Sequence, residues 1–549
     1  MRRTPGPFIK PTSLPRASLL IAVIGLATKI TGFLRITALT IHLGAIRPTD
    51  AFLTAFLIPE TLYLFLTEGA VTSAFVPVFT RYALRSPDSF RRLLIQSSAI
   101  ALVLASTLAA LIGYGGHRIV YLVAPGFDSA TVDSTRNLLQ IILPYIPLTL
   151  MGAILTAASN AVGHYVSPAL GPLLFNLCVI GSVPFSSPDH LSPLAWGVVV
   201  GGLAQLLVQM PYMVTTLQRH QEKENPEDPI DPENPNGSIG PEHSARSDLP
   251  PERVLDEIPP TRIHPGIREM THLAIPLALT TAMIQFQILA ERTIASTLEG
   301  GVITNLNLVQ KLSNLPLGLI GMAVAVPLLP LLSLDWLAGR ERTFGRRVER
   351  GVTTAFVLVT PIAVFFYLHA PDLVTILFRR GAYNAHSSEV AADLLRWYSL
   401  ALPAISACYL LAGSFLATGD ATTPSLLKGV LHLANIVLNF ELIEMLDAST
   451  IPFCYSLMYN LNLILLVIFL HRRVRTIPIL AITGTAVATL AIWVASGHLS
   501  HYAISRISVE GPLALTLDGA LMTGLGGMAI FGFFARTRRP ENPVESPGA

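Results

Sequence analysis

The chain has 549 residues, of which 51% are apolar and only 13% are charged, and its mean hydropathy is +0.56. Soluble proteins carry about twice this charged fraction, so the composition excludes an ordinary soluble protein and predicts a chain that crosses a membrane many times. The formal net charge of +2 says little, because the charges are segregated along the chain. The three isolated cysteines give neither a disulfide framework nor a metal-binding spacing.

Residues 1–17 are basic and rich in proline, and no small-residue cleavage site follows them, so we expect a cytoplasmic tail rather than a signal peptide. The first long apolar stretch, 18–44, contains Lys29 and Arg35. A cation inside a membrane span is costly unless it faces a wet cavity or a partner. These two lie six residues apart, about 9 Å along a helix, so both can border one groove and hold an anion there.

Windows of about 20 apolar residues predict an all-α polytopic membrane protein with fourteen spans. They run over residues 18–44, 51–79, 93–115, 137–162, 168–186, 193–218, 270–297, 303–336, 352–370, 391–417, 423–446, 452–471, 477–499 and 512–535. The second and the eighth contain proline and glycine, so we expect them to be bent.

A polar segment rich in Pro, Glu and Asp, residues 219–269, follows the sixth span and is expected to be a disordered cytoplasmic linker. It separates an N-lobe of six spans, 18–218, from a C-lobe of six, 270–471, as in transporters built from two related halves. Two further spans occupy 472–535, and 536–549 form a tail.

The basic residues set the orientation, because cytoplasmic loops of membrane proteins carry an excess of Lys and Arg. Their clusters predict that both termini lie in the cytoplasm. The clusters are Arg81, Arg85, Arg91 and Arg92; Arg340, Arg342, Arg346, Arg347 and Arg350; Arg472, Arg473 and Arg475; and Arg536, Arg538 and Arg539.

Three acids lie in or beside the second span: Asp50 at its outer start, Glu60 directly after Pro59, and Glu68. Acids at membrane depth are costly unless they are satisfied. In the functional interpretation they pair with the buried cations and help to close one face of a cavity. In the alternative, Asp50 and Glu68 form purely structural ion pairs.

No nucleotide-binding loop, zinc-ligand spacing or catalytic triad is present in the sequence. We therefore expect a transporter rather than an enzyme, with no catalytic residues and no organic cofactor.

The segment GFLR, followed by GAIRPTDAFLTAFLIPETLYLFLTEGAVTSAFVPVFTRY, resembles the N-terminal signature of the MurJ (MviN) lipid II flippases, which belong to the multidrug/oligosaccharidyl-lipid/polysaccharide exporter superfamily. Residues 307–333 resemble the family's eighth-span block, and VAPGFD at 123–128 matches one of its loops. The resemblance implies two six-helix lobes in a V around a cationic cavity, with two C-terminal helices lining a lipid groove. It also implies transport of undecaprenyl-pyrophosphate-linked muropeptide to the periplasmic leaflet for peptidoglycan synthesis.

The resemblance also implies the site residues. Arg35 stands at one of the family's cavity arginines, while Lys29 and Lys311 stand at two others. A further usual arginine is replaced by Tyr63, and lysine keeps the charge but not the planar fork that clamps a phosphate, so the exact head group stays open. The predicted substrate-binding residues are Lys29, Arg35 and Lys311, and the predicted gating or cavity residues are Asp50, Glu60, Tyr63 and Glu68.

Some members of the family bind sodium through an acid on span seven and a polar pair on span eleven. Glu291, Asn435 and Asn439 match that pattern, and Ser456 is a weaker addition. The oxygen atoms of these side chains suit a hard cation. In the alternative, Glu291 pairs with Arg292 or Lys311, and the asparagines make interhelical hydrogen bonds.

Three other functions stay open: an exporter of another polyprenyl-linked oligosaccharide, a drug or organic-cation exporter of the same superfamily, and a non-transporting scaffold for envelope assembly. Cations in spans one and eight argue against the drug exporter, which needs an acidic cavity. The expected partners are the lipid-linked muropeptide, membrane lipids and proteins of cell-wall synthesis, and no nucleic acid.

Overall fold

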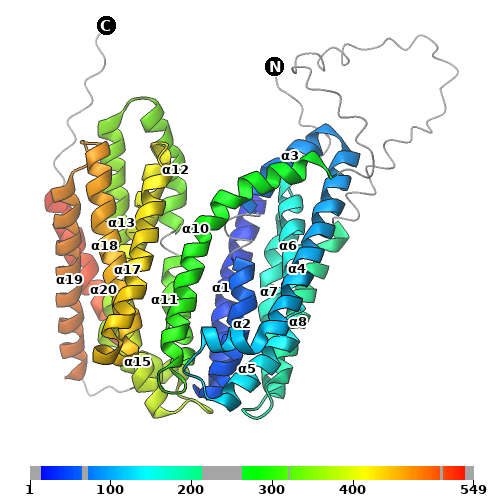
Figure 1. Ribbon diagram of the computed structural model, residues 1–549. Coiled ribbons are helices and arrows are strands. Elements are labelled where there is room, and N and C mark those ends of the chain that lie inside the picture. Colours follow the sequence, from blue (N-terminus) through cyan, green and yellow to red (C-terminus); the bar gives the residue numbers. More distant parts are fainter. Residues whose placement is uncertain (1–13, 65–71, 213–262, 319–321, 507–510, 538–549) are drawn as a thin grey trace, which may run out of the picture.

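The computed structural model describes residues 14–64, 72–212, 263–318, 322–506 and 511–537. Its regular elements are all helices within these ranges, and one isolated bridge pairs Ser187 with His190. The helices form two bundles that stand side by side (Figure 1). We call the end of the molecule at which α3 lies the upper end, and the end at which α5 and α15 lie the lower end.

The first bundle contains α1 (Leu14–Leu43), α2 (Arg47–Leu64), α3 (Thr72–Arg85), α4 (Pro87–Val123), α5 (Ser129–Ile142), α6 (Tyr145–Ala161), α7 (Val166–Ser182), η2 (Val183–Phe185) and α8 (Ser192–Leu207). The start of α4 shows how the sequence sets a boundary. Ser86 caps the helix by accepting a hydrogen bond from the Ser89 amide, and Pro87 fills the first turn, where an N–H is not needed.

The second bundle contains α10 (Pro265–Ser296), α11 (Val302–Pro316), α12 (Met322–Leu337), α13 (Glu341–Leu368), α14 (Ala370–Phe378), α15 (Ala385–Ser399), α16 (Leu402–Ala417), α17 (Thr422–Leu446), η5 (Asp447–Ser449), α18 (Thr450–Arg473), α19 (Ile479–Ser505) and α20 (Pro512–Thr537). Helix α10 runs obliquely from the upper end of the first bundle to the lower part of the second (Figure 1). An ion pair between Arg81 of α3 and Glu269 attaches its upper end to the first bundle.

Every predicted span overlaps a helix or an interrupted pair of helices. The eighth span is covered by α11 and α12, but residues 319–321 between them lie outside the described ranges, so its bend stays a prediction. The fourth is bent by 42° between α5 and α6. In the described part of the chain, nine helical segments are long and apolar enough to cross a membrane, or ten if the bent pair counts as one span. The all-α class is thus confirmed, while the number of fourteen and the domain limits stay predictions.

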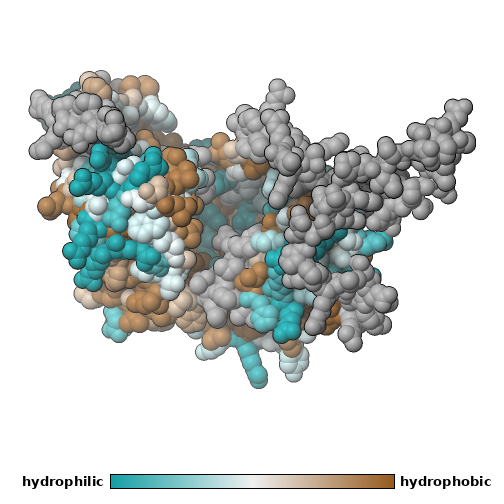
Figure 2. All heavy atoms as spheres, turned by 90° about the horizontal axis from the view of Figure 1, so that it is seen from above, coloured by the Kyte–Doolittle hydropathy of each residue, from teal (hydrophilic) through white to brown (hydrophobic). Residues whose placement is uncertain are grey.

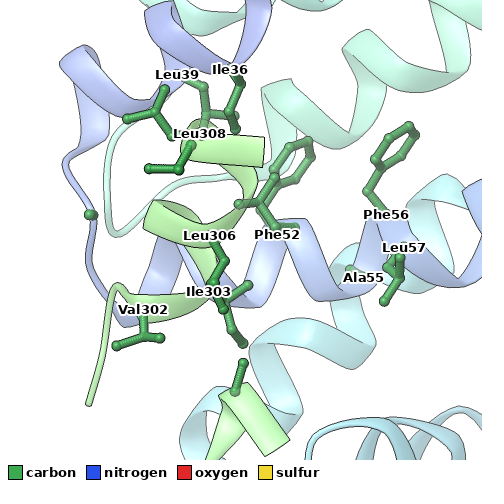
Figure 3. Close-up of a cluster of buried hydrophobic side chains, with 14 of the residues drawn as sticks. Ile36, Leu39, Phe52, Ala55, Phe56, Leu57, Val302, Ile303, Leu306 and Leu308 are labelled. Atoms are coloured by element: carbon green, nitrogen blue, oxygen red, sulfur yellow. The ribbon is translucent and has the colours of Figure 1, made fainter. Parts of the chain in front are cut away.

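The largest apolar core joins the two bundles at the lower end. Ile36 and Leu39 of α1 and Phe52 of α2 pack in one cluster with Ile303 and Leu308 of α11 (Figure 3). The other two large clusters do not join the bundles in this way. One lies in α3, α4, α6 and α8 with a single residue of α10, and the other lies entirely in the second bundle. The bundles are therefore held together at one end and separate toward the other.

Candidate functional site

A cavity of about 400 Å³ lies between the bundles and is bordered by α1, α2, α7 and α11. It brings together Lys29 and Arg35 from the first bundle and Lys311 from the second, the three residues predicted to bind substrate. Glu60 and Tyr63 also line it. Seen from the upper end, the space between the bundles is a recess with hydrophilic residues inside it (Figure 2).

Arg35 is held by aromatic rings. Its guanidinium carbon lies 5.3 Å from the ring centroids of both Phe56 and Phe175. A guanidinium at this distance from an aromatic face is attracted by the ring quadrupole. The rings therefore orient the arginine without neutralising it, which leaves its charge available to a ligand.

Lys29 reaches from α1 toward the other bundle. A Cβ atom added to Gly318, at the end of α11, would collide with its ammonium group. The absence of a side chain at Gly318 therefore provides the room in which this amine lies. Because Gly318 belongs to the second bundle, the position of Lys29 depends on how the bundles are placed.

The cavity is positively charged. Within the described part of the chain, no carboxylate lies within ion-pair distance of Lys29, Arg35 or Lys311. Among the described lining residues Glu60 is the single acid, so these three cations and one acid sum to a formal charge of +2. In a poorly screened site between helices this charge attracts an anion far more strongly than it would in bulk water.

Arg292 of α10 is a cation whose place at the cavity the sequence analysis missed. It lines a small extension of the cavity together with Arg35, Glu60 and Lys311. Its side chain is buried, and its Nη1 atom has no hydrogen-bond partner among the described residues. The signal was available, since an arginine within an apolar span is costly, but Arg292 was considered only as a partner for Glu291. No ion pair joins those two in the described structure.

Asp50 lies outside this cavity. Its carboxylate accepts hydrogen bonds from the Gly301 amide at 2.6 Å, the Thr304 amide at 2.9 Å and the Thr304 hydroxyl at 2.7 Å. It therefore caps the start of α11 across the bundle boundary, and backbone groups take the place of the expected cation. Gly301 adopts φ 96° here, a left-handed conformation that glycine tolerates.

Three further contacts close the lower end. Arg47 donates to the carbonyl oxygens of Ser296 at 3.1 Å and Leu298 at 2.7 Å. The Gly126 amide donates to the Ser296 hydroxyl at 3.1 Å, and the Ala382 amide donates to the Ile41 carbonyl at 2.8 Å. Gly126 belongs to the VAPGFD loop, so that loop is part of the closure. Glu68, the other acid predicted to gate the cavity, lies outside the described residues.

The residues predicted to bind sodium form a partly connected group. Gln287 of α10 donates to Glu291 at 2.6 Å and to Asn435 at 3.2 Å, and Asn439 donates to Asn435 at 2.8 Å. Ser456 instead donates to the Trp397 carbonyl at 2.5 Å and makes no hydrogen bond to the other three in the described structure. The sequence analysis did not identify Gln287, the side chain that links Glu291 to Asn435.

These side chains leave acceptor atoms without partners. The Oε1 atom of Gln287 and the Oδ1 atom of Asn439 are buried and accept no hydrogen bond from the described residues. Buried oxygens of this kind are costly unless something satisfies them. Like the oxygens of the Glu291 carboxylate, they belong to the class of hard donors that Na⁺ prefers.

An apolar groove of about 750 Å³ runs along the second bundle, bordered mainly by α13, α18 and α19. Of the two C-terminal helices predicted to line a lipid groove, α19 borders this apolar groove, and whether lipid occupies it stays a prediction. No described residue of α20 is among the lining residues. Gly526 of α20 instead packs against Trp493, so α20 supports α19 from behind.

A sequence model for the family described as "Lipid II flippase MurJ" matches residues 40–513. The chain belongs to the MurJ family. It is 26% identical over 468 residues to the lipid II flippase MurJ of Burkholderia cenocepacia, with 84% of each chain covered. It is 27% identical over 533 residues to the probable lipid II flippase MurJ of Rhizobium meliloti, with 92% of each covered.

Solved structures agree with the MurJ assignment at the level of the fold. A lipid II flippase MurJ in an inward closed conformation matches with a TM-score of 0.74 at 18% identity, covering 94% of this chain and 100% of that one. An inward-facing multidrug resistance transporter of the MATE family and MOP superfamily matches at 0.60 and 12% identity, covering 84% and 98%. The chain is therefore an integral membrane protein with the MurJ fold, and its role is that of a transporter.

Proposed function

We propose that this chain is a lipid II flippase, which carries undecaprenyl-pyrophosphate-linked muropeptide from the cytoplasmic to the periplasmic leaflet. The observation that supports this most is the cavity that collects Lys29, Arg35 and Lys311 from both bundles, with Glu60 the one acid among its described lining residues. A pyrophosphate carries the charge that such a cavity attracts, and three separate cations can share its oxygens.

The head group and the lipid tail would be held in different places. Lys29, Arg35 and Lys311 neutralise the pyrophosphate, while Glu60 and Tyr63 border the space beside it. The apolar groove along α13, α18 and α19 offers the tail a surface chemically similar to lipid. Neither step breaks a covalent bond, so these residues bind and orient the substrate and do no chemistry on it.

Transport would proceed by alternating access. The contacts of Asp50, Arg47 and Gly126 keep the lower end closed, and the cavity faces the upper end. Breaking those contacts while the upper ends of the bundles approach each other would expose the cations to the opposite side. The bound substrate supplies the free energy for this change only to the extent that it binds the second state better.

We propose Na⁺ as the coupling ion. Gln287, Glu291, Asn435 and Asn439 would hold it, and the two acceptor oxygens without partners support this choice. The ion would supply positive charge between α10 and α17. That charge would stabilise one arrangement of these helices.

The upper end is proposed to be cytoplasmic, with both termini on that side. Basic residues are concentrated there, among them Arg81, Arg340, Arg347 and Arg473, and cytoplasmic loops carry such an excess. The membrane would then be the bacterial inner membrane. Proteins of cell-wall synthesis are the proposed partners, because they consume the precursor on the opposite face.

The test is head-group translocation in proteoliposomes that contain purified lipid II. Lys29→Ala, Arg35→Ala and Lys311→Ala should each lower the rate at least about tenfold, since each removes a charged contact worth about 1.5–3 kcal/mol. Arg506→Ala is the matched control, because Arg506 is exposed at the end of α19. Wild-type rates in all three cavity variants would reject the proposal.

A second candidate is export of a different polyprenyl-linked oligosaccharide. The lysines at 29 and 311 and the tyrosine at 63 favour it, because they depart from the arginines usual in the family. Competition for binding between lipid II and a polyprenyl-pyrophosphate carrying another glycan separates the two. Stronger binding of lipid II supports the first function, and equal or weaker binding supports the second.

A further inference from the structure

A cluster of three metal-ligand side chains lies away from both the cavity and the candidate sodium site. His369 follows the last turn of α13, His501 lies on α19, and Asp518 lies on α20. One potential ligand atom from each side chain lies within 4.8 Å of the others. Residues so distant in sequence gave no spacing by which a metal motif could be recognised.

The separations of these atoms suit a tetrahedral metal ion. The Oδ2 atom of Asp518 lies 3.3 Å from His369 Nε2 and 3.3 Å from His501 Nδ1. Zinc binds histidine nitrogen and carboxylate oxygen at about 2.0–2.2 Å, which places neighbouring ligands of a tetrahedron roughly 3.3–3.6 Å apart. Two of the three separations therefore match this geometry, and the third is at most 4.8 Å.

The cluster is also incompletely satisfied. The side chains of His369 and Asp518 are 2% and 3% exposed, and Asp518 Oδ2 is hydrogen-bonded to His501 Nδ1, but His369 Nε2 and Asp518 Oδ1 make no hydrogen bond within the described structure. A buried carboxylate without full compensation is costly. A cation between the three side chains would remove that cost, which is an independent reason to place one there.

The exposure of His501 and the nearby Asp372 are also compatible with a bound metal ion. His501 is 62% exposed, so an ion can enter from solvent and a water molecule can take the fourth position. The Asp372 carboxylate lies 4.0 Å from the other ring nitrogen of His369. This distance is too long for a hydrogen bond, so Asp372 contributes only its negative charge near His369.

We propose that His369, His501 and Asp518 bind a divalent transition metal, with zinc the ion best suited to two imidazoles and one carboxylate. The ion would fasten α19 and α20 to the junction of α13 and α14. Because α13 and α19 both border the apolar groove, the metal would fix the distance between its two walls. The proposal does not depend on which lipid the groove receives.

The test uses the full chain in detergent, without a histidine tag, titrated with Co²⁺ as a spectroscopic probe. One equivalent should bind with the visible absorption of a tetrahedral cobalt site, and Zn²⁺ should displace it. His501→Ala and Asp518→Asn should each weaken binding by more than about tenfold, since even outer residues of metal sites contribute 10–100-fold.

His498→Ala is the matched control, since His498 is exposed one turn earlier on α19 and lies outside the cluster. His501 is exposed as well, so its loss should leave the fold intact and any lost binding can be assigned to the ligand. Wild-type affinity in His501→Ala, or no tetrahedral cobalt spectrum in the wild type, would overturn the proposal.

Discussion

Asp50 of α2 and Thr304 of α11 join the two bundles through a pair of hydrogen bonds, in which the Thr304 amide and hydroxyl both donate to Oδ1. One turn earlier on α2, Arg47 donates to carbonyl oxygens at and just after the end of α10. A helix carries partial positive charge at its start and partial negative charge at its end. Helix α2 thus presents an anion to the start of one helix of the second bundle and a cation to the end of another.

Asp50→Asn should open the lower end more often. The amide keeps the size of the side chain but loses the charge and places a donor opposite donors, which costs about 1.5–3 kcal/mol. Spin labels can be placed at Ala130 and Glu389, which are both exposed near the lower end. In the distance distribution between the two labels, the longer-distance population should be about tenfold larger in the variant than in the wild type. An unchanged distance distribution would contradict the assignment of Asp50 to this closure.

Gly126→Ala should also destabilise the closed lower end, but through a steric clash and not through a lost charge. A Cβ atom at this position would collide with the backbone of Ser296 and Thr297 in the other bundle, and backbone cannot yield as a flexible side chain can. We expect at least about a tenfold loss of transport. Gly25→Ala is the control, because nothing lies within 4 Å of a Cβ atom there. Equal loss in both variants would refute a specific role for the loop.

Arg35→Lys should weaken head-group binding although it conserves charge. The lysine loses the contacts with the rings of Phe56 and Phe175 and the planar fork that matches a phosphate. We expect roughly tenfold weaker binding of lipid II in a detergent binding assay, with an unchanged melting temperature. Full affinity in this variant would mean that charge alone is recognised.

Asn439→Ala should weaken the apparent affinity for sodium in transport. It removes a buried oxygen without a partner, while its Nδ2 group contributes only contacts to Asn435. The sodium concentration that gives half-maximal rate should rise about tenfold or more. Ser456→Ala is the comparison, because its hydroxyl is already donated to Trp397, and it should leave that concentration unchanged. A larger rise of that concentration in Ser456→Ala than in Asn439→Ala would contradict the assignment of Asn439 to the sodium site.

Asp420 should contribute a pH-dependent part of the stability. The Thr423 amide, the Thr423 hydroxyl and Arg473 hold the pKa of this loop carboxyl below its usual value of 3.8. A lowered pKa stabilises the folded protein above the unfolded pKa, and the contribution is lost as pH falls through the folded value. Asp420→Asn should therefore melt lower than wild type at pH 7, and the difference should shrink below about pH 4. A constant difference down to pH 2.5 would contradict this.

Much of this arrangement could be predicted from the sequence, because a segment that crosses a membrane must be apolar and its composition therefore reveals it. Apolar windows located the helices, and the cost of Lys29 and Arg35 at membrane depth marked two of the residues that line the cavity, while the family resemblance implied Lys311. These inferences are local, so they required no knowledge of which helices meet.

What the sequence did not predict depends on tertiary pairing. Asp50 was expected to pair with a cation, but its hydrogen bonds go to residues at the start of α11. Backbone amides leave no signal in a sequence, so this partner could not be predicted. Gln287 is uncharged, so it attracts no notice beside Glu291. Helix α20 is apolar like α19, and composition does not show that it packs behind α19. The cluster of His369, His501 and Asp518 is assembled from three helices, so no spacing reveals it.

The oblique course of α10 has a mechanical consequence. Its 32 residues span about 48 Å as one helix, with Glu269 paired to the first bundle near one end and Glu291 near the other. Pro276 lies in the interior of α10, and an interior proline removes a backbone hydrogen bond and lets a helix bend. A tilt imposed near Glu291 would therefore be divided between movement of the opposite rim and bending at this proline.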